Sequence, residues 1–205
     1  MKRVAIFGGT FNPIHLGHIN LCQECGKHIY LDKVILIPTN IPPHKETNQL
    51  ADDYHRLQMC QLAVQGDCWF EVSDLEIKRK GVSYTIHTIE KLKQQHSDWK
   101  LYFLIGSDML FMFHKWYQYQ KILEQVDLIV GAREPKEYER MVAYTQKILK
   151  NHQNIHIIHI QPFPVSSTQI RQLIQQNQPV KKYLPSNVFD YIQQHHLYQV
   201  TKEMK

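Results

Sequence analysis

Residues 8–18 read Gly8-Gly9-Thr10-Phe11-Asn12-Pro13-Ile14-His15-Leu16-Gly17-His18, and they directly follow the apolar run at residues 4–7. A strand that leads through a glycine-rich turn into a helix presents backbone N–H groups and the positive end of a helix dipole to an anion. Two histidines three residues apart face the same side of the first helical turn. The stretch therefore predicts a nucleotide-phosphate site with two imidazole donors.

Two better-known phosphate loops do not fit residues 8–18. The dinucleotide fingerprint requires G-x-G-x-x-G, and the Walker loop requires Gly-Lys-Ser/Thr. Here the two histidines take the place of the Walker lysine, with a charge that is tunable near neutral pH. Gly17 leaves the backbone between them open to close approach. Thr10 and Phe11 can add a hydroxyl and a backbone N–H to the phosphate contacts.

Length and composition predict one α/β domain over residues 1–199, with residues 200–205 as a frayed tail. The chain has 205 residues, of which 43% are apolar, and a formal net charge of +5. Its Lys and Arg residues are spread along the chain, which suits anionic small molecules and gives no support for nucleic-acid binding. We expect a cytoplasmic protein without membrane contact, since no leader opens the chain and no apolar stretch approaches the ~18 residues that span a bilayer.

Short β-branched runs alternate with segments of helical period, which predicts βα units around a parallel sheet. The expected fold is α/β, a Rossmann-like doubly wound parallel sheet with a C-terminal helical segment. The candidate strands are 3–7, 33–37, 69–73, 101–105, 127–130 and 154–158. The candidate helices are 16–28, 53–64, 85–95, 107–113 with 117–125, 137–151, 167–175 and 186–195. In such sheets the ligand lies at the carboxyl ends of the strands, where the motifs of this chain begin.

Four cysteines are too few for a disulfide framework in a chain of this length. His15, His18, Cys22 and Cys25 could be read as a zinc quartet. Ten residues of helix rise by ~15 Å, however, whereas tetrahedral zinc ligands converge within ~2.3 Å of one ion. We therefore expect Cys22 and Cys25 to be buried against the sheet.

A second anion site is predicted near the end of the chain, at Ser166, Ser167 and Thr168. These hydroxyls are typical of a helix N-cap, which needs no ligand. Arg171, however, lies three and four residues beyond Thr168 and Ser167, on the same side of the first turns. Hydroxyls, a helix N-terminus and a guanidinium together form an anion clamp.

Three motifs in this order resemble those of the nucleotidyltransferase superfamily: the H-x-G-H core at residues 15–18, Gly106-Ser107-Asp108 after an apolar run, and the Ser-Ser-Thr-Gln-Ile-Arg stretch at residues 166–171. Three further segments resemble the bacterial nicotinate-mononucleotide adenylyltransferases in particular. They are Pro42-Pro43-His44-Lys45, Ser83-Tyr84-Thr85 and Trp116-Tyr117.

The motifs and the resemblance together imply three sets of site residues. The catalytic set is His15, His18, Arg171 and Lys45. The ATP-binding set is Gly8, Gly9, Thr10, Phe11, His18, Gly106, Asp108, Ser167, Thr168 and Arg171. The substrate-binding set is Asn40, His44, Lys45, Tyr84, Thr85, Trp116 and Tyr117.

The aromatic face of Trp116 is the predicted platform for the pyridine ring, although core packing also explains aromatic residues in such a stretch. Asn40 and Thr85 would border the same ring, and the helix that starts at Thr85 could offer N–H groups to the nicotinate carboxylate. His87 departs from the family pattern, which has an aspartate two residues after the threonine, so position 87 receives no role.

The resemblance implies adenylyl transfer from ATP to nicotinate mononucleotide, with pyrophosphate as the leaving group. Because the attacking phosphate is already ionised, positioning and charge stabilisation are sufficient for catalysis. Mg²⁺ is expected to arrive with ATP, and no protein ligand to a metal is predicted. Three alternatives stay open: nicotinamide mononucleotide as acceptor, phosphopantetheine as acceptor, or a nucleotide-binding regulator without turnover. The residues predict no oligomeric state.

Overall fold

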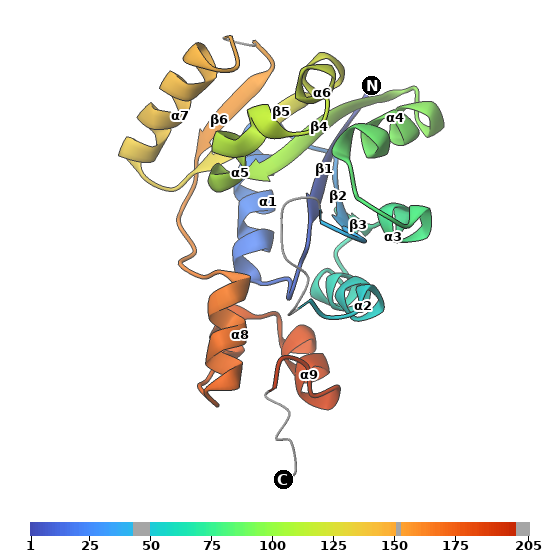
Figure 1. Cartoon of the computed structure of the whole chain (residues 1–205), viewed down its shortest axis with the longest axis vertical. Helices are drawn as coiled ribbons and strands as arrows, with labels where there is room; N and C mark the ends of the chain where they lie inside the picture. The colour runs from blue at the N-terminus through green and yellow to red at the C-terminus, as the bar shows by residue number, and fades with distance from the viewer. Residues whose placement is uncertain (43–49, 151–152, 200–205) are drawn as a thin grey trace.

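The computed structural model describes residues 1–42, 50–150 and 153–199. These residues form one sheet with the strand order β3-β2-β1-β4-β5-β6, in which every neighbouring pair is parallel. The strands are β1 (Lys2–Gly9), β2 (Lys33–Pro38), β3 (Phe70–Val72), β4 (Trp99–Gly106), β5 (Asp127–Ala132) and β6 (Ile155–His159). The winding direction reverses at β1 and β4, which confirms the predicted Rossmann-like, doubly wound sheet (Figure 1).

Helices connect the strands and close the described part of the chain (Figure 1). They are α1 (Leu16–Ile29), α2 (Asp53–Ala63), α3 (Leu75–Arg79), α4 (Thr85–Gln95), α5 (Ser107–Met112), α6 (Tyr119–Gln125), α7 (Pro135–Lys147), α8 (Ser167–Gln175) and α9 (Ser186–Gln194). Two 3₁₀ turns are η1 (Phe113–Lys115) and η2 (Lys181–Tyr183). The predicted C-terminal helical segment is thus α8, η2 and α9.

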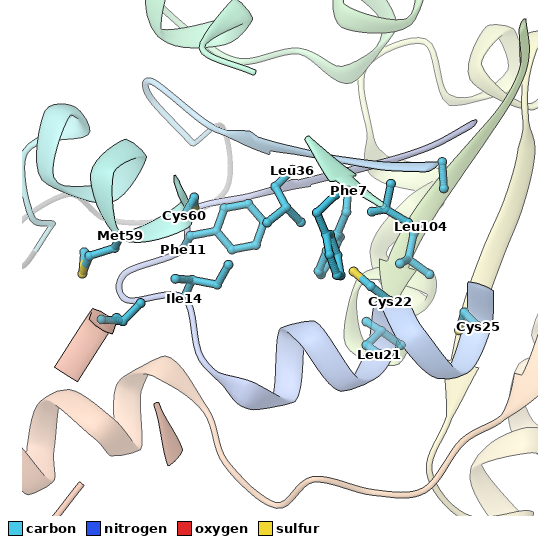
Figure 2. Close-up of a cluster of buried hydrophobic side chains, with 14 of the residues drawn as sticks. Phe7, Phe11, Ile14, Leu21, Cys22, Cys25, Leu36, Met59, Cys60 and Leu104 are labelled. Carbon is cyan, nitrogen blue, oxygen red and sulfur yellow. The ribbon is translucent and has the colours of Figure 1, made fainter. Parts of the chain in front are cut away.

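Side chains that alternate along the strands fill two apolar layers. Ala5 and Phe7 point into the layer that α1, α2, α8 and α9 cover, and Figure 2 shows part of it. Val4 and Ile6 point to the opposite face, which α4, α5, α6 and α7 cover. Because both faces are buried, the strands are almost continuously apolar, as the sequence shows for the runs at 4–7 and 101–105.

The cysteines confirm the expected burial. Cys22 and Cys25 have no exposed surface and lie on the side of α1 that faces the sheet (Figure 2). Burial raises the pKa of Cys25 to about 12 and the pKa of Cys22 well above its ordinary value. Cys60 is also buried, and Cys68 is exposed. In the described ranges, no helix is long and apolar enough to cross a membrane.

Two helices start at different residues from those predicted. Helix α6 begins at Tyr119 and not at Tyr117, because Gln118 has a left-handed backbone with φ 54°. Helix α7 begins at Pro135 and not at Glu137, because proline is well accommodated in the first turn. The predicted end of that helix at Asn151 lies outside the described residues, and the observed helix ends at Lys147.

Strand β4 is longer than predicted, because Trp99 and Lys100 pair with Lys2 and Arg3 at the start of β1. Strand β3 is shorter and spans Phe70–Val72 only. Helix α3 was not predicted, since five residues are too few to show a helical period. The proposed tail at 200–205 lies outside the described residues, and the single-domain boundary at 199 stays a prediction.

Candidate active site

A cavity of about 390 Å³ lies at the carboxyl ends of β1, β4 and β5. It brings together motifs from the beginning, the middle and the end of the chain. Fifteen of the predicted site residues line it: Gly8, Gly9, Thr10, Phe11, His15, His18, Tyr84, Thr85, Gly106, Asp108, Trp116, Tyr117, Ser167, Thr168 and Arg171. The expected meeting of the two histidines with Arg171 is therefore observed.

The rings of the two histidines pack against each other at the N-terminus of α1, with their planes tilted by 31°. His15 is the N-cap residue and His18 is the third residue of the helix, with their ring centroids 3.7 Å apart. The backbone N–H of His15 donates to Nδ1 of His18 at 3.2 Å. Since Nδ1 of His18 accepts this bond, a neutral His18 carries its proton on Nε2.

His15 is held in its neutral form. Its side chain is 5% exposed, and burial lowers its pKa to about 4, with a further contribution from the positive charge of Arg133. Nδ1 of His15 is buried and has no hydrogen-bond partner among the described residues.

Small and aromatic residues of the loop fix the position of the histidine rings. A Cβ at Gly17 would lie 3.0 Å from Cε1 and Nδ1 of His15, and a Cβ at Gly9 would lie 3.0 Å from Cζ of Phe11. The buried ring of Phe11 stands edge-on to His18 with centroids 5.2 Å apart. Glycine at both positions therefore permits the packing that supports the imidazoles.

Helix α8 is joined to the loop that precedes α1. Ser167 Oγ donates to the carbonyl of Pro13 at 2.9 Å, and Arg171 Nη1 donates to the carbonyl of Asn12 at 2.9 Å. Arg171 Nη2 also lies 3.4 Å from Thr168 Oγ1, which agrees with the predicted i, i+3 relation. These bonds place the guanidinium beside the histidine pair.

A cluster of aromatic side chains lines another part of the cavity. Trp116 packs against Phe103 and Phe113, with ring centroids 5.8 and 5.3 Å apart. Tyr117 is 48% exposed, and its ring lies 4.8 Å from that of Tyr84, the N-cap residue of α4. The N-terminus of α4 therefore lies next to an aromatic wall.

The remaining predicted residues have different outcomes. Asn40 is not among the lining residues, and its side chain donates to Asp53 Oδ2 at 2.7 Å. His44 and Lys45 lie outside the described residues. The exposed His87 stands edge-on to Tyr117 with centroids 6.0 Å apart.

Gly106 and Asp108 occupy the end of β4 and the first turn of α5, where the sequence places them. A Cβ at Gly106 would lie 2.8 Å from Oδ1 of Asp108, which shows how closely that carboxylate folds back on the turn. Asp108 itself is exposed at the edge of the cavity.

Comparison with known proteins identifies the family. The sequence model of the family described as Cytidylyltransferase-like matches residues 6–173. A protein of Bacillus subtilis named "Nicotinate-nucleotide adenylyltransferase" is 34% identical over 97% of this chain and 100% of its own length. A Clostridium tetani protein named "Probable nicotinate-nucleotide adenylyltransferase" is 36% identical with the same coverage. The chain belongs to the nicotinate-nucleotide adenylyltransferase family.

A solved structure with the same fold agrees with this family assignment. It is Plasmodium falciparum nicotinic acid mononucleotide adenylyltransferase complexed with NaAD, and it superposes with a TM-score of 0.78. The sequence identity is 21%, and the match covers 97% of this chain and 98% of the other. At this identity the likeness establishes the fold of this family member.

Several lining residues of this adenylyltransferase family member were not found from its sequence. Arg133 follows β5, while Thr39 follows β2 and Ser83 precedes α4. The rule that ligands lie at the carboxyl ends of parallel strands could have found Arg133 and Thr39. Ser83 was quoted within a motif, but its buried hydroxyl was not recognised as part of the cavity wall.

Proposed function

We propose that this protein transfers the adenylyl group of ATP to nicotinate mononucleotide, giving nicotinate adenine dinucleotide and pyrophosphate in NAD biosynthesis. The observation that carries the proposal is the meeting of His15, His18 and Arg171 in one cavity with the aromatic wall around Trp116. This reaction requires two features. One is a site that binds the phosphates, formed here by His15, His18 and Arg171, which we call the phosphate grip. The other is a flat surface on which the pyridine ring can stack.

The triphosphate of ATP binds between α1 and α8. The N-termini of both helices border this part of the cavity, and helix N-termini stabilise anions. Gly8, Gly9, Thr10 and Phe11 supply backbone and hydroxyl donors on one side. Ser167, Thr168 and Arg171 supply donors on the other. Gly106 and Asp108 border the adenosine.

The pyridine ring of the acceptor stacks on Trp116, with Tyr117 and Asn40 near its edge. The N-terminus of α4 receives the nicotinate carboxylate, because the positive end of a helix dipole favours an acid over a neutral amide. The N–H of Tyr84 already donates to the carbonyl of Val82 at 3.1 Å. Donors to the carboxylate therefore come from Thr85 onward.

In the reaction, an oxygen of the acceptor phosphate attacks the α-phosphorus of ATP in line. One P–O bond forms to that oxygen, and the P–O bond to the bridging oxygen of the β-phosphate breaks, so pyrophosphate leaves with the electron pair. The acceptor phosphate is ionised near neutral pH, so the enzyme supplies no general base. Its residues orient the two phosphates and stabilise charge.

His18 donates from Nε2 to a phosphate oxygen as negative charge moves toward pyrophosphate. His15, which is neutral at pH 7, adds a hydrogen bond without adding charge. Arg171 provides the fixed positive charge, and His44 and Lys45, which follow β2 in the sequence, add further donors to the phosphates. Preorganised donors of this kind need no rearrangement during the reaction.

Mg²⁺ enters as part of the ATP substrate and neutralises its phosphate oxygens. The N–H groups, hydroxyls and guanidinium around the phosphates bind phosphate oxygens, and the carboxylates of Asp108 and Glu76 also line the cavity. Chelation with EDTA is expected to stop pyrophosphate release, and excess Mg²⁺ is expected to restore it.

The direct test measures pyrophosphate release from ATP and Mg²⁺ with three acceptors in parallel: nicotinate mononucleotide, nicotinamide mononucleotide and phosphopantetheine. The expected result is turnover with the first, and a kcat/KM for the second that is lower by about tenfold or more, since one charged hydrogen bond is lost. His18→Ala serves as the inactive control.

Two results would contradict the proposal. Preferred turnover with phosphopantetheine would assign another reaction of the same superfamily. Binding of ATP without pyrophosphate release from any acceptor would indicate a regulator.

A further inference from the structure

Arg56 is a charged residue inside the protein core that touches none of the proposed substrates. It lies on α2, and only 1% of its surface is exposed. Buried charges are uncommon unless their hydrogen-bonding capacity is used. Arg56 is not among the residues that line the cavity. Its burial therefore calls for a role that is different from ligand contact.

The guanidinium of Arg56 donates to four backbone carbonyls. Nε donates to Ala51 at 3.0 Å, and Nη1 donates to Thr10 at 3.0 Å and to Thr39 at 2.6 Å. Nη2 donates to Asn40 at 3.3 Å. Three separate segments of the chain are thereby fixed to one rigid, planar group.

Two of these segments lie at different ends of the cavity. Thr10 belongs to the loop that binds the ATP phosphates in the proposed function, and Thr39 lines the cavity at the end of β2. Asn40 continues toward the acceptor end, where its N–H donates to Ser83 Oγ at 3.0 Å just before α4. Arg56 thus links the phosphate loop with the segment that leads to the acceptor.

Two neighbouring bonds extend the same network. The N–H of Ala51 donates to Asn12 Oδ1 at 3.0 Å, and Asn12 also accepts from Arg171 through its carbonyl. The side-chain amide of Asn40 donates to Asp53 Oδ2 at 2.7 Å. The bonds around Arg56 therefore reach, through Asn12, the guanidinium of the phosphate grip.

We propose that Arg56 is a positioning residue that sets the spacing between the phosphate loop and the acceptor end of the cavity. This inference rests on the proposed function, which assigns substrates to those two ends. Without the planar guanidinium of Arg56, the carbonyls of Thr10, Thr39 and Asn40 lose their common hydrogen-bond donor. Each segment then shifts toward other hydrogen-bond partners. Both substrates then bind less well, and they are less well aligned for in-line attack.

The decisive variant is Arg56→Lys, which keeps the positive charge and the aliphatic stem. A single ammonium cannot span carbonyls that are arranged around a planar fork. We expect KM to rise for both ATP and nicotinate mononucleotide, and kcat/KM to fall by about 10²-fold, the size of effect that a misplacement of about 1 Å produces.

Met59→Ala is the matched control. Met59 lies one turn further along α2, is fully buried and belongs to the apolar layer that α1, α2, α8 and α9 cover. Its truncation leaves a cavity and lowers Tm without removing any bond of Arg56. We expect its kcat/KM to stay within about threefold of wild type at temperatures well below its Tm.

Kinetics are measured at a temperature where melting curves show both variants folded. If Arg56→Lys changes KM and kcat no more than Met59→Ala does, the proposal is wrong, and Arg56 serves stability alone. If neither Arg56→Lys nor Arg56→Gln folds at any temperature, the residue is required for folding, and the proposal is likewise overturned. Lack of pyrophosphate release by the wild type with nicotinate mononucleotide would overturn the proposed function instead.

Discussion

The helices α1 and α8 point their N-termini at the same cavity but are capped by different chemistry. The cap of α1 consists of two imidazoles, His15 and His18, with ring centroids 3.7 Å apart and ring planes tilted by 31°. The cap of α8 is formed by Ser166 and Gln169, in which each side chain accepts a hydrogen bond from the backbone N–H of the other residue. Ser166 Oγ accepts from the N–H of Gln169 at 3.2 Å, and Gln169 Oε1 accepts from the N–H of Ser166 at 2.8 Å.

From this difference we expect the α1 cap to affect the reaction rate and the α8 cap to affect the stability of the fold. Both helices begin with a capping box, and in α1 its members are imidazoles that line the cavity. The α8 box pairs Ser166 with Gln169, and Gln169 is exposed and outside the cavity lining. The α8 groups that the proposed function assigns to phosphate binding are Ser167, Thr168 and Arg171, and Ser167 and Arg171 are bonded to the loop before α1. Substitutions at the two ends should therefore change different measured quantities.

The largest effect is expected at the α1 cap. His18→Ala removes the Nε2 donor, and kcat should fall by about 10²- to 10³-fold, the usual cost of one preorganised donor. Pyrophosphate release under saturating substrates measures this change, and a thermal melt checks the fold. His18→Gln, which keeps an N–H donor, should recover part of the loss. If His18→Ala has a kcat close to that of the wild type, the α1 cap does not contribute to catalysis, and the expected difference between the α1 and α8 caps is wrong.

Arg171→Ala should come next, because it removes a charge from the phosphates and also the bond to the carbonyl of Asn12. We expect kcat/KM to fall by about 10²-fold. Ser167→Ala is the comparison variant. It removes the bond to Pro13, and its loss in the free energy of unfolding should be about 1 kcal/mol. An Arg171→Ala enzyme with unchanged KM for ATP would argue against a shared grip.

The pH dependence of stability should identify the buried imidazole of the α1 cap. The folded pKa of His15 is about 4, below the ordinary value of 6.5, so the unfolded chain binds more protons between these values. Stability from this group is complete above pH 6.5 and is lost as the pH falls toward 4. Between pH 7.5 and 4.5 the loss should be about 2 to 3 kcal/mol.

Urea unfolding of wild type and His15→Gln at both pH values measures the contribution of this imidazole. The wild type should lose more stability than the variant over the same interval, because only the wild type carries the group with the lowered pKa. Equal losses in the two proteins would show that His15 titrates normally in the folded state.

The smallest effect is expected at the α8 cap. Gln169→Ala removes one half of the capping box, and Gln169 is exposed and outside the cavity lining. The free energy of unfolding should fall by about 0.5 to 1 kcal/mol, with little change in kcat. Denaturant titration and initial rates on the same preparation separate the two quantities. A large loss of kcat would mean that the α8 cap also takes part in catalysis.

Local sequence patterns predicted the parts of the site that lie on short, contiguous motifs. The His15–His18 spacing and the Thr168–Arg171 spacing each place side chains on one helical face, so their geometry follows from the helix itself. The parallel sheet then explains why distant motifs meet, because all carboxyl ends lie at one edge. The apolar runs likewise predicted the positions of the strands.

The contributions of Arg56 and Arg133 could not be predicted in the same way. Arg56 stands in the polar stretch at residues 52–56, which looks like the exposed start of a helix. Its burial depends on carbonyls that are up to 46 positions away in the chain. The lowered pKa of His15 likewise depends on burial and on Arg133, which only the folded structure brings near. Such properties belong to long-range packing and not to any local pattern.

The bond between Arg171 and Asn12 joins residues that are 159 positions apart in the chain. During translation, the histidine loop leaves the ribosome long before Arg171 has been synthesised. A nascent chain can form β1 and α1 early, yet it lacks Arg171 and the other α8 groups of the proposed phosphate site until α8 has been synthesised. We therefore expect adenylyl transfer to begin only after α8 has left the ribosome, and a chain terminated before α8 to be inactive.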